Sequence, residues 1–122
     1  MGSRLQDGLA DLRRTYLERL DPAMDEILQD WARFRIGGDV EAATRLQRGV
    51  HRLAGSGATF GFRALSNTAA DLEDRLDHAI GSGAGLDEPA VEEIEQGLER
   101  LRTTVRRLEG SRPRRRTSGR AV

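Results

Sequence analysis

The chain lacks cysteine and lysine, and only five of its 122 residues are aromatic. Without cysteine, neither a disulfide framework nor a thiolate metal site is possible. The absence is compatible with a reducing compartment, and we expect a cytoplasmic protein. No apolar run approaches the roughly 20 residues that a membrane-spanning helix needs. A single domain with one hydrophobic core is therefore the starting hypothesis.

Arginine supplies all 20 basic side chains, and 20 acidic residues balance them. Residues 110–122 are rich in Arg, Ser, Gly and Pro and have no apolar periodicity, so we expect a flexible tail. Because the chain is balanced overall and no aromatic residues interleave with these arginines, a solubilising or linker segment is favoured over a nucleic-acid or membrane contact.

Apolar residues recur three and four positions apart, the spacing that predicts amphipathic α-helices. Scarce β-branched and aromatic residues likewise favour an all-α fold over a sheet. Four such stretches connected by short loops favour an antiparallel four-helix bundle. The stretches are 24–34, 43–60, 62–79 and 91–108.

Proline and acidic residues indicate where two of these helices start. Asp21 before Pro22, and Asp87 before Glu88 and Pro89, are each predicted to be helix N-caps. Glycines at 37–38, at 61 and in 81–85 indicate turns.

An additional N-terminal helix through Leu9, Leu12, Tyr16 and Leu20 is predicted to pack on the bundle. Met1, Gly2 and Ser3 resemble a cloning remnant, so residues 1–8 are expected to be flexible. The domain organisation is then a flexible 1–8, a bundle over 9–109 and a tail over 110–122.

The second predicted helix of the bundle carries His51 on its solvent side. At about 100° per residue, His51 lies roughly 130° from the centre of that helix's apolar stripe. Small residues surround it on the same face, which would leave the imidazole accessible to another protein. We therefore predict a partner-binding face made of Thr44, Ala54, Gly55 and Ala58 around His51.

Glycines in a helix interior cost stability and need a reason. Gly57 lies on the apolar stripe, where it is expected to allow close helix packing. Gly55 lies on the histidine face, where it is expected to keep space beside the ring.

The run from His51 to Gly61 resembles the signature of the histidine-containing phosphotransfer (HPt) family. That signature reads His-x-Leu-Lys-Gly-Ser, followed five residues later by Gly. The resemblance covers roughly residues 9–108. The matching residues are His51, Leu53, Gly55, Ser56 and Gly61.

This resemblance implies a phosphorelay carrier. His51 would accept a phosphoryl group from the phospho-aspartate of a response-regulator receiver domain and pass it to another receiver. A hybrid histidine kinase is a further candidate partner. In this family the receiver supplies Mg²⁺, so the chain is expected to have no metal site, no cofactor and no independent catalytic machinery. It is also expected to be a monomer.

One residue departs from the family pattern, because Ala54 stands where the signature has a phosphate-neutralising lysine. Arg48, one turn before His51 and roughly 60° around the helix, is the candidate replacement. Arg52 and Arg45 are weaker candidates because they point further away, and Gln47 is an alternative that would hydrogen-bond the ring or the phosphate. A solvated surface role for Arg48 remains the competing interpretation.

Two other classes of function stay open. A bundle that binds receiver domains or another partner without being phosphorylated is compatible with the missing lysine. The dimerisation region of a sensor kinase is disfavoured, since the Glu-and-Pro pattern typical of that class does not follow His51. His78 is interpreted as a surface residue near a helix C-terminus, and two isolated histidines make a poor metal site.

Overall fold

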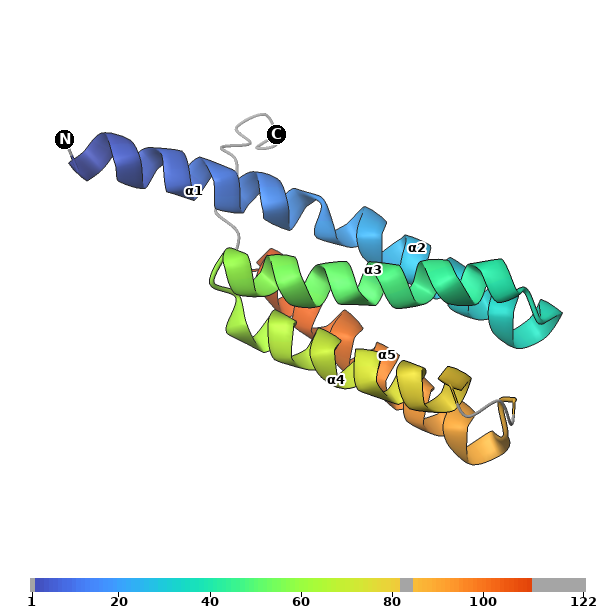
Figure 1. Cartoon of the computed structure of the whole chain (residues 1–122). Helices are drawn as coiled ribbons and strands as arrows, with labels where there is room; N and C mark the ends of the chain where they lie inside the picture. The colour runs from blue at the N-terminus through green and yellow to red at the C-terminus, as the bar shows by residue number, and fades with distance from the viewer. Residues whose placement is uncertain (1, 82–84, 111–122) are drawn as a thin grey trace, which may run out of the picture.

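Five α-helices make up the regular structure of the part of the chain that the structure describes (Figure 1). The structure is a computed structural model and describes residues 2–81 and 85–110. No strand occurs within these ranges, so the prediction of an all-α fold is confirmed. The helices are α1 (Gly2–Glu18), α2 (Leu20–Gly37), α3 (Val40–Thr59), α4 (Arg63–Gly81) and α5 (Glu88–Gly110).

The last four helices form the predicted antiparallel bundle. Helix α2 packs on α3, α3 on α4 and α4 on α5, and α5 closes the bundle against α2. The largest fully buried side chains come from all four helices and from the apolar stripes predicted for them, with Leu20 preceding the first stripe. They are Leu20, Leu46, Val50, Leu65, Leu72, Leu76, Ile94, Leu101 and Val105.

Local hydrogen bonds fix the ends of the bundle helices. Asp87 Oδ1 accepts from the backbone N–H of Ala90 at 2.9 Å, which confirms Asp87 as the N-cap of α5. Asp39 caps α3 in the same way through Ala42, at 3.1 Å. Gly38 (φ 67°) and Gly61 (φ 82°) adopt the left-handed conformation that glycine tolerates best, at the turns before α3 and before α4.

The predicted N-cap at Asp21 is wrong. Helix α2 already begins at Leu20, after a brief break at Arg19, and no side chain caps it. Leu20 is only 1% exposed, and burying it keeps the chain helical before the expected start. Pro22 lies in the first helical turn, where a missing N–H breaks no intrahelical hydrogen bond.

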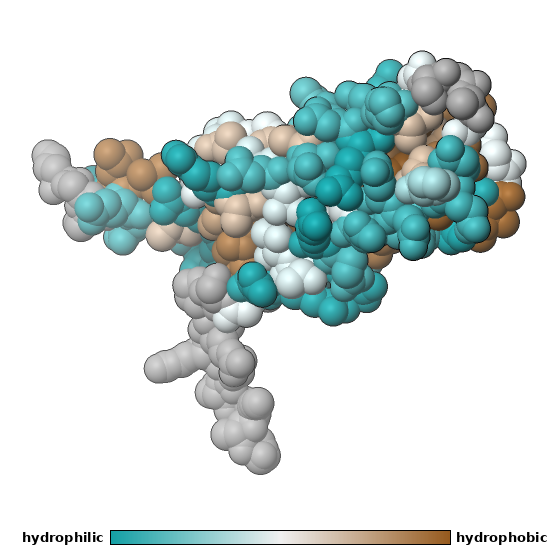
Figure 2. All heavy atoms as spheres, turned by 90° about the horizontal axis from the view of Figure 1, so that it is seen from below, coloured by the Kyte–Doolittle hydropathy of each residue, from teal (hydrophilic) through white to brown (hydrophobic). Residues whose placement is uncertain are grey.

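Helix α1 differs from the prediction at its beginning and in its packing. It starts at Gly2, so residues 2–8, which were expected to be flexible, are helical. It extends past the end of the bundle (Figure 1), and Figure 2 shows hydrophobic surface on the projecting part. Leu9 and Leu12 are 48% and 56% exposed, so the expectation that they pack on the bundle is wrong. The predicted tail from 111 onward lies outside the described residues.

Close contacts between helices explain the interior glycines of α3. A β-carbon added to Gly57 would lie 3.1 Å from the backbone nitrogen of Ser66 and 3.3 Å from Leu65 Cγ. One added to Gly49 would lie 3.3 Å from Ile27 Cγ1. The packing role predicted for Gly57 is confirmed. A β-carbon on Gly55 would meet nothing within 4 Å, as expected for an open surface.

Two alanine substitutions should therefore change stability in opposite directions. Gly57→Ala should lower the free energy of unfolding by about 1–3 kcal/mol, since the backbone of Ser66 cannot move aside cheaply. Gly55→Ala should raise it by up to about 1 kcal/mol, the difference in helix propensity. Urea unfolding followed by circular dichroism measures both, and equal effects at the two positions would contradict the packing argument.

Candidate functional site

His51 projects from α3 into a shallow hollow between α3 and α4. Its side chain is 74% exposed, as its angular position predicted. Helix α3 supplies most of the wall, because residues one turn apart share a face, and α4 supplies one carboxylate. The hollow is lined by Thr44, Gln47, Arg48, His51, Arg52 and Glu73.

Glu73 of α4 holds the imidazole. Its Oε2 lies 2.6 Å from His51 Nδ1, and its side chain is only 25% exposed. The neutral imidazole carries one proton, and opposite an ionised carboxylate, which can only accept a hydrogen bond, that proton belongs on Nδ1. The lone pair of Nε2 is then available for chemistry. Glu73 was not predicted as a site residue, because nothing in the local sequence sets it apart from the other acidic residues of this helix.

Gln47 is committed to a different partner from the one predicted. Its Nε2 donates to Asp77 Oδ1 of α4 at 3.0 Å, and no hydrogen bond joins it to His51. Gln47 lines the hollow all the same. It therefore links the two helices beside the site.

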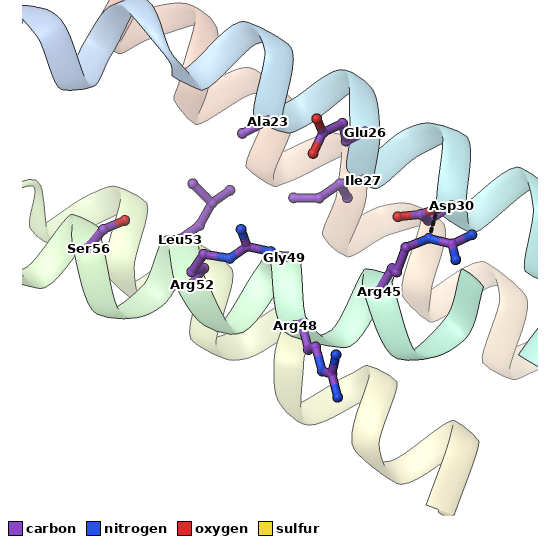
Figure 3. Close-up of a pocket in the computed structure, with 10 residues that line it drawn as sticks. All are labelled: Ala23, Glu26, Ile27, Asp30, Arg45, Arg48, Gly49, Arg52, Leu53 and Ser56. Carbon is purple, nitrogen blue, oxygen red and sulfur yellow. Dashed lines mark hydrogen bonds and ion pairs between the residues drawn. The ribbon is translucent and has the colours of Figure 1, made fainter. Parts of the chain in front are cut away.

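The three arginines of α3 differ in what they contact. Arg45 Nε donates to Asp30 Oδ1 of α2 at 3.1 Å, whereas Arg48 and Arg52 form no ion pair with any described residue. Figure 3 shows the guanidinium of Arg48 pointing away from α2. Both arginines line the His51 hollow and also the groove between α2 and α3, a cavity of about 320 Å³, but in Figure 3 the side chain of Arg52 lies along that groove. Arg48 is thus the free cation better placed for a group on His51.

Comparison with protein-family models gives one match, the Hpt domain, over residues 11–104. This stretch covers most of the chain and includes His51 and Glu73. The chain belongs to the Hpt domain family. No curated protein and no solved structure matches it. Membership makes it a phosphotransfer module of two-component signalling, and Hpt domains typically interact with receiver domains and kinases.

The small residues predicted to frame the histidine of this Hpt domain do not share one hollow. Thr44 lines the His51 hollow, and Gly55 is exposed on the open surface. Ala58 borders a separate depression at the turn between α3 and α4. Ala54 is half-buried against the core, and its carbonyl accepts a hydrogen bond from Ser66 Oγ at 2.8 Å.

Ser56, another residue of the signature, ties α1 to the bundle. Its Oγ lies 2.6 Å from the hydroxyl of Tyr16, whose ring stacks on Phe60 and Phe62 at centroid distances of 4.6 and 5.7 Å. Burial raises the pKa of Tyr16 above its usual 10.0, and the hydrogen bond between Tyr16 and Ser56 partly opposes this rise. Ser56 therefore has a structural partner, away from the hollow.

Neither a metal centre nor a membrane-spanning helix occurs within residues 2–81 and 85–110. Within these ranges, no cluster of three or more His, Cys, Asp or Glu side chains is placed to hold a metal ion. None of the helices described there combines the length and apolar character needed to cross a bilayer.

Removing Glu73 should release the imidazole. In Glu73→Ala we expect His51 to lose its preference for the Nδ1–H tautomer, because the acceptor that holds this proton is gone. Long-range ¹H–¹⁵N NMR spectra report the tautomer directly. His78, which is exposed and whose imidazole forms no hydrogen bond with a described residue, serves as the internal control. An unchanged His51 spectrum would contradict the assigned role of Glu73.

Proposed function

We propose that His51 is the phosphoacceptor of this Hpt domain and that it exchanges a phosphoryl group with aspartates of receiver domains. One observation carries the proposal. His51 is 74% exposed, and its Nδ1 is bound to Glu73, which leaves Nε2 as the nucleophile. The alternative is a bundle that binds receivers without being phosphorylated.

In the proposed step, the lone pair of Nε2 attacks phosphorus in line with the bond to the aspartate oxygen. The N–P bond forms as the O–P bond breaks, and the aspartate leaves as a carboxylate. No proton needs to move, because Nδ1 keeps its proton throughout. The positive charge that the ring gains lies next to the carboxylate of Glu73, at 2.6 Å from Nδ1. Return of the phosphoryl group to a second receiver is the reverse of this step.

Phosphoryl transfer needs positioning and charge neutralisation more than it needs covalent help from the protein. We assign the neutralising role on this chain to Arg48 alone, since it lines the hollow, has no described ionic partner and points away from α2. We expect Mg²⁺ and a lysine on the receiver. On this proposal the chain contributes the histidine, its orientation and one guanidinium.

The proposal predicts that the variant His51→Gln cannot accept a phosphoryl group. Incubation of the wild-type chain with a panel of phosphorylated receiver domains from its organism should give acid-labile, alkali-stable phosphate, and the variant should give none. His78→Gln is the matched control and should behave as wild type. Binding of a receiver without any transfer would instead support the interaction-module alternative.

Loss of the Arg48 guanidinium should slow transfer without abolishing it. For Arg48→Ala we expect a rate reduced about tenfold, because a charge-assisted hydrogen bond to phosphate contributes roughly 1.5–3 kcal/mol and solvent screens part of it here. Arg102→Ala, an exposed arginine on α5, is the matched control. If transfer rate and phosphohistidine lifetime match those of the control, Arg48 is a solvated surface residue.

A further inference from the structure

The two flanks of the His51 hollow have opposite charge. On the α3 flank, Arg48 and Arg52 are exposed and have no described ionic partner. On the α4 flank, Glu73 and Asp77 lie one turn apart on one face, joined to α3 through His51 and Gln47. The imidazole therefore stands on a boundary between a basic and an acidic strip.

Neighbouring charges do not cancel this division. Arg75, the arginine of α4 nearest in sequence to Glu73, pairs with Asp71 at 3.0 Å and donates to the carbonyl of Glu93 on α5 at 2.9 Å. It is therefore engaged on the α5 side of its helix. Across the α2–α3 groove, Glu26 pairs with neither Arg48 nor Arg52. Apart from the contacts of Glu73 with His51 and of Asp77 with Gln47, no ion pair among the described residues neutralises either strip.

We propose that this charge boundary orients the receiver domain that docks on His51. The partner that fits presents an acidic side toward the arginines of α3 and a basic side toward the carboxylates of α4. This inference rests on the proposed phosphotransfer at His51 and deepens it. Complementary charges across an interface suppress wrong orientations and set the encounter rate more than they raise affinity. A carrier that must align Nε2 with an aspartyl phosphate gains directly from such orientation.

The decisive comparison is between single and double charge reversals. Arg52→Glu removes the net charge of the α3 flank, because the new carboxylate opposes Arg48, and Asp77→Arg removes that of the α4 flank, because the new guanidinium opposes Glu73. The double variant keeps the net charge of the wild type but has no difference in charge between the two flanks. If polarity orients the partner, each single variant raises the apparent KM for the receiver by at least about threefold, and the double variant does not recover. The probe is the receiver domain that transfers fastest to the wild-type chain, charged with acetyl phosphate.

Two controls separate docking from chemistry. Arg102→Glu and Glu99→Arg, exposed positions on α5, make the same charge changes away from the hollow and should leave KM unchanged. Phosphorylation of His51 by phosphoramidate, a small donor that needs no docking, should proceed at the wild-type rate in every variant.

Three results would overturn the inference. A double variant that regains the wild-type KM would show that net charge alone attracts the receiver, and it would overturn the inference. Single variants that match the α5 controls would overturn it as well, as would a parallel loss of the phosphoramidate reaction. In the first two cases transfer to His51 persists and the proposed function stands. If no receiver transfers to the wild-type chain, the proposed function and this inference fail together.

Discussion

The register between α3 and α4 is the constraint on which the site depends. Gly57 has no side chain, so the start of α4 comes close enough for Ser66 to lie against it. The two helices run antiparallel from that contact. His51 lies six residues before Gly57 on α3, and Glu73 lies seven residues after Ser66 on α4, so the two side chains face each other. Four residues further on each helix, Gln47 meets Asp77. A helix turn of slip would separate both pairs, because neighbours on one face of a helix are three or four residues apart.

This dependence explains which parts of the site the sequence could predict. The exposure of His51 follows from its angle to the apolar stripe of its own helix, a local property that one helix is enough to determine. The contact with Glu73 depends on two helices and on a packing distance set elsewhere, at Gly57. Gln47 illustrates the same limit, since its position on the histidine face was predicted and its partner Asp77 was not.

The helix ends likewise show where a local sequence signal predicts the structure and where burial of neighbouring residues overrides it. Asp87 acts as a cap because the residues before it are not helical and its side chain is free to reach Ala90. Asp21 has the same local sequence signal, but Leu17 and Leu20 on either side of the break at Arg19 are both buried. Their burial outweighs the capping preference, which is worth only about 1 kcal/mol. The apolar pattern of α1 was likewise read as packing, although a pattern alone does not say whether a neighbouring helix extends far enough to cover it.

The missing lysine and Arg48 would approach His51 from different sides of helix α3. Ala54 and Arg48 lie on opposite flanks of the histidine, about 60° away in each direction. Ala54 faces Ser66 and α4, where Glu73 and Asp77 already form an acidic strip. A cation on that side would be drawn to these carboxylates as well as to a phosphate. Arg48 stands on the other side, apart from any described acidic partner. Under the proposed phosphotransfer, a cation on the Arg48 side of the histidine would stay available for a phosphoryl group while Glu73 holds the ring.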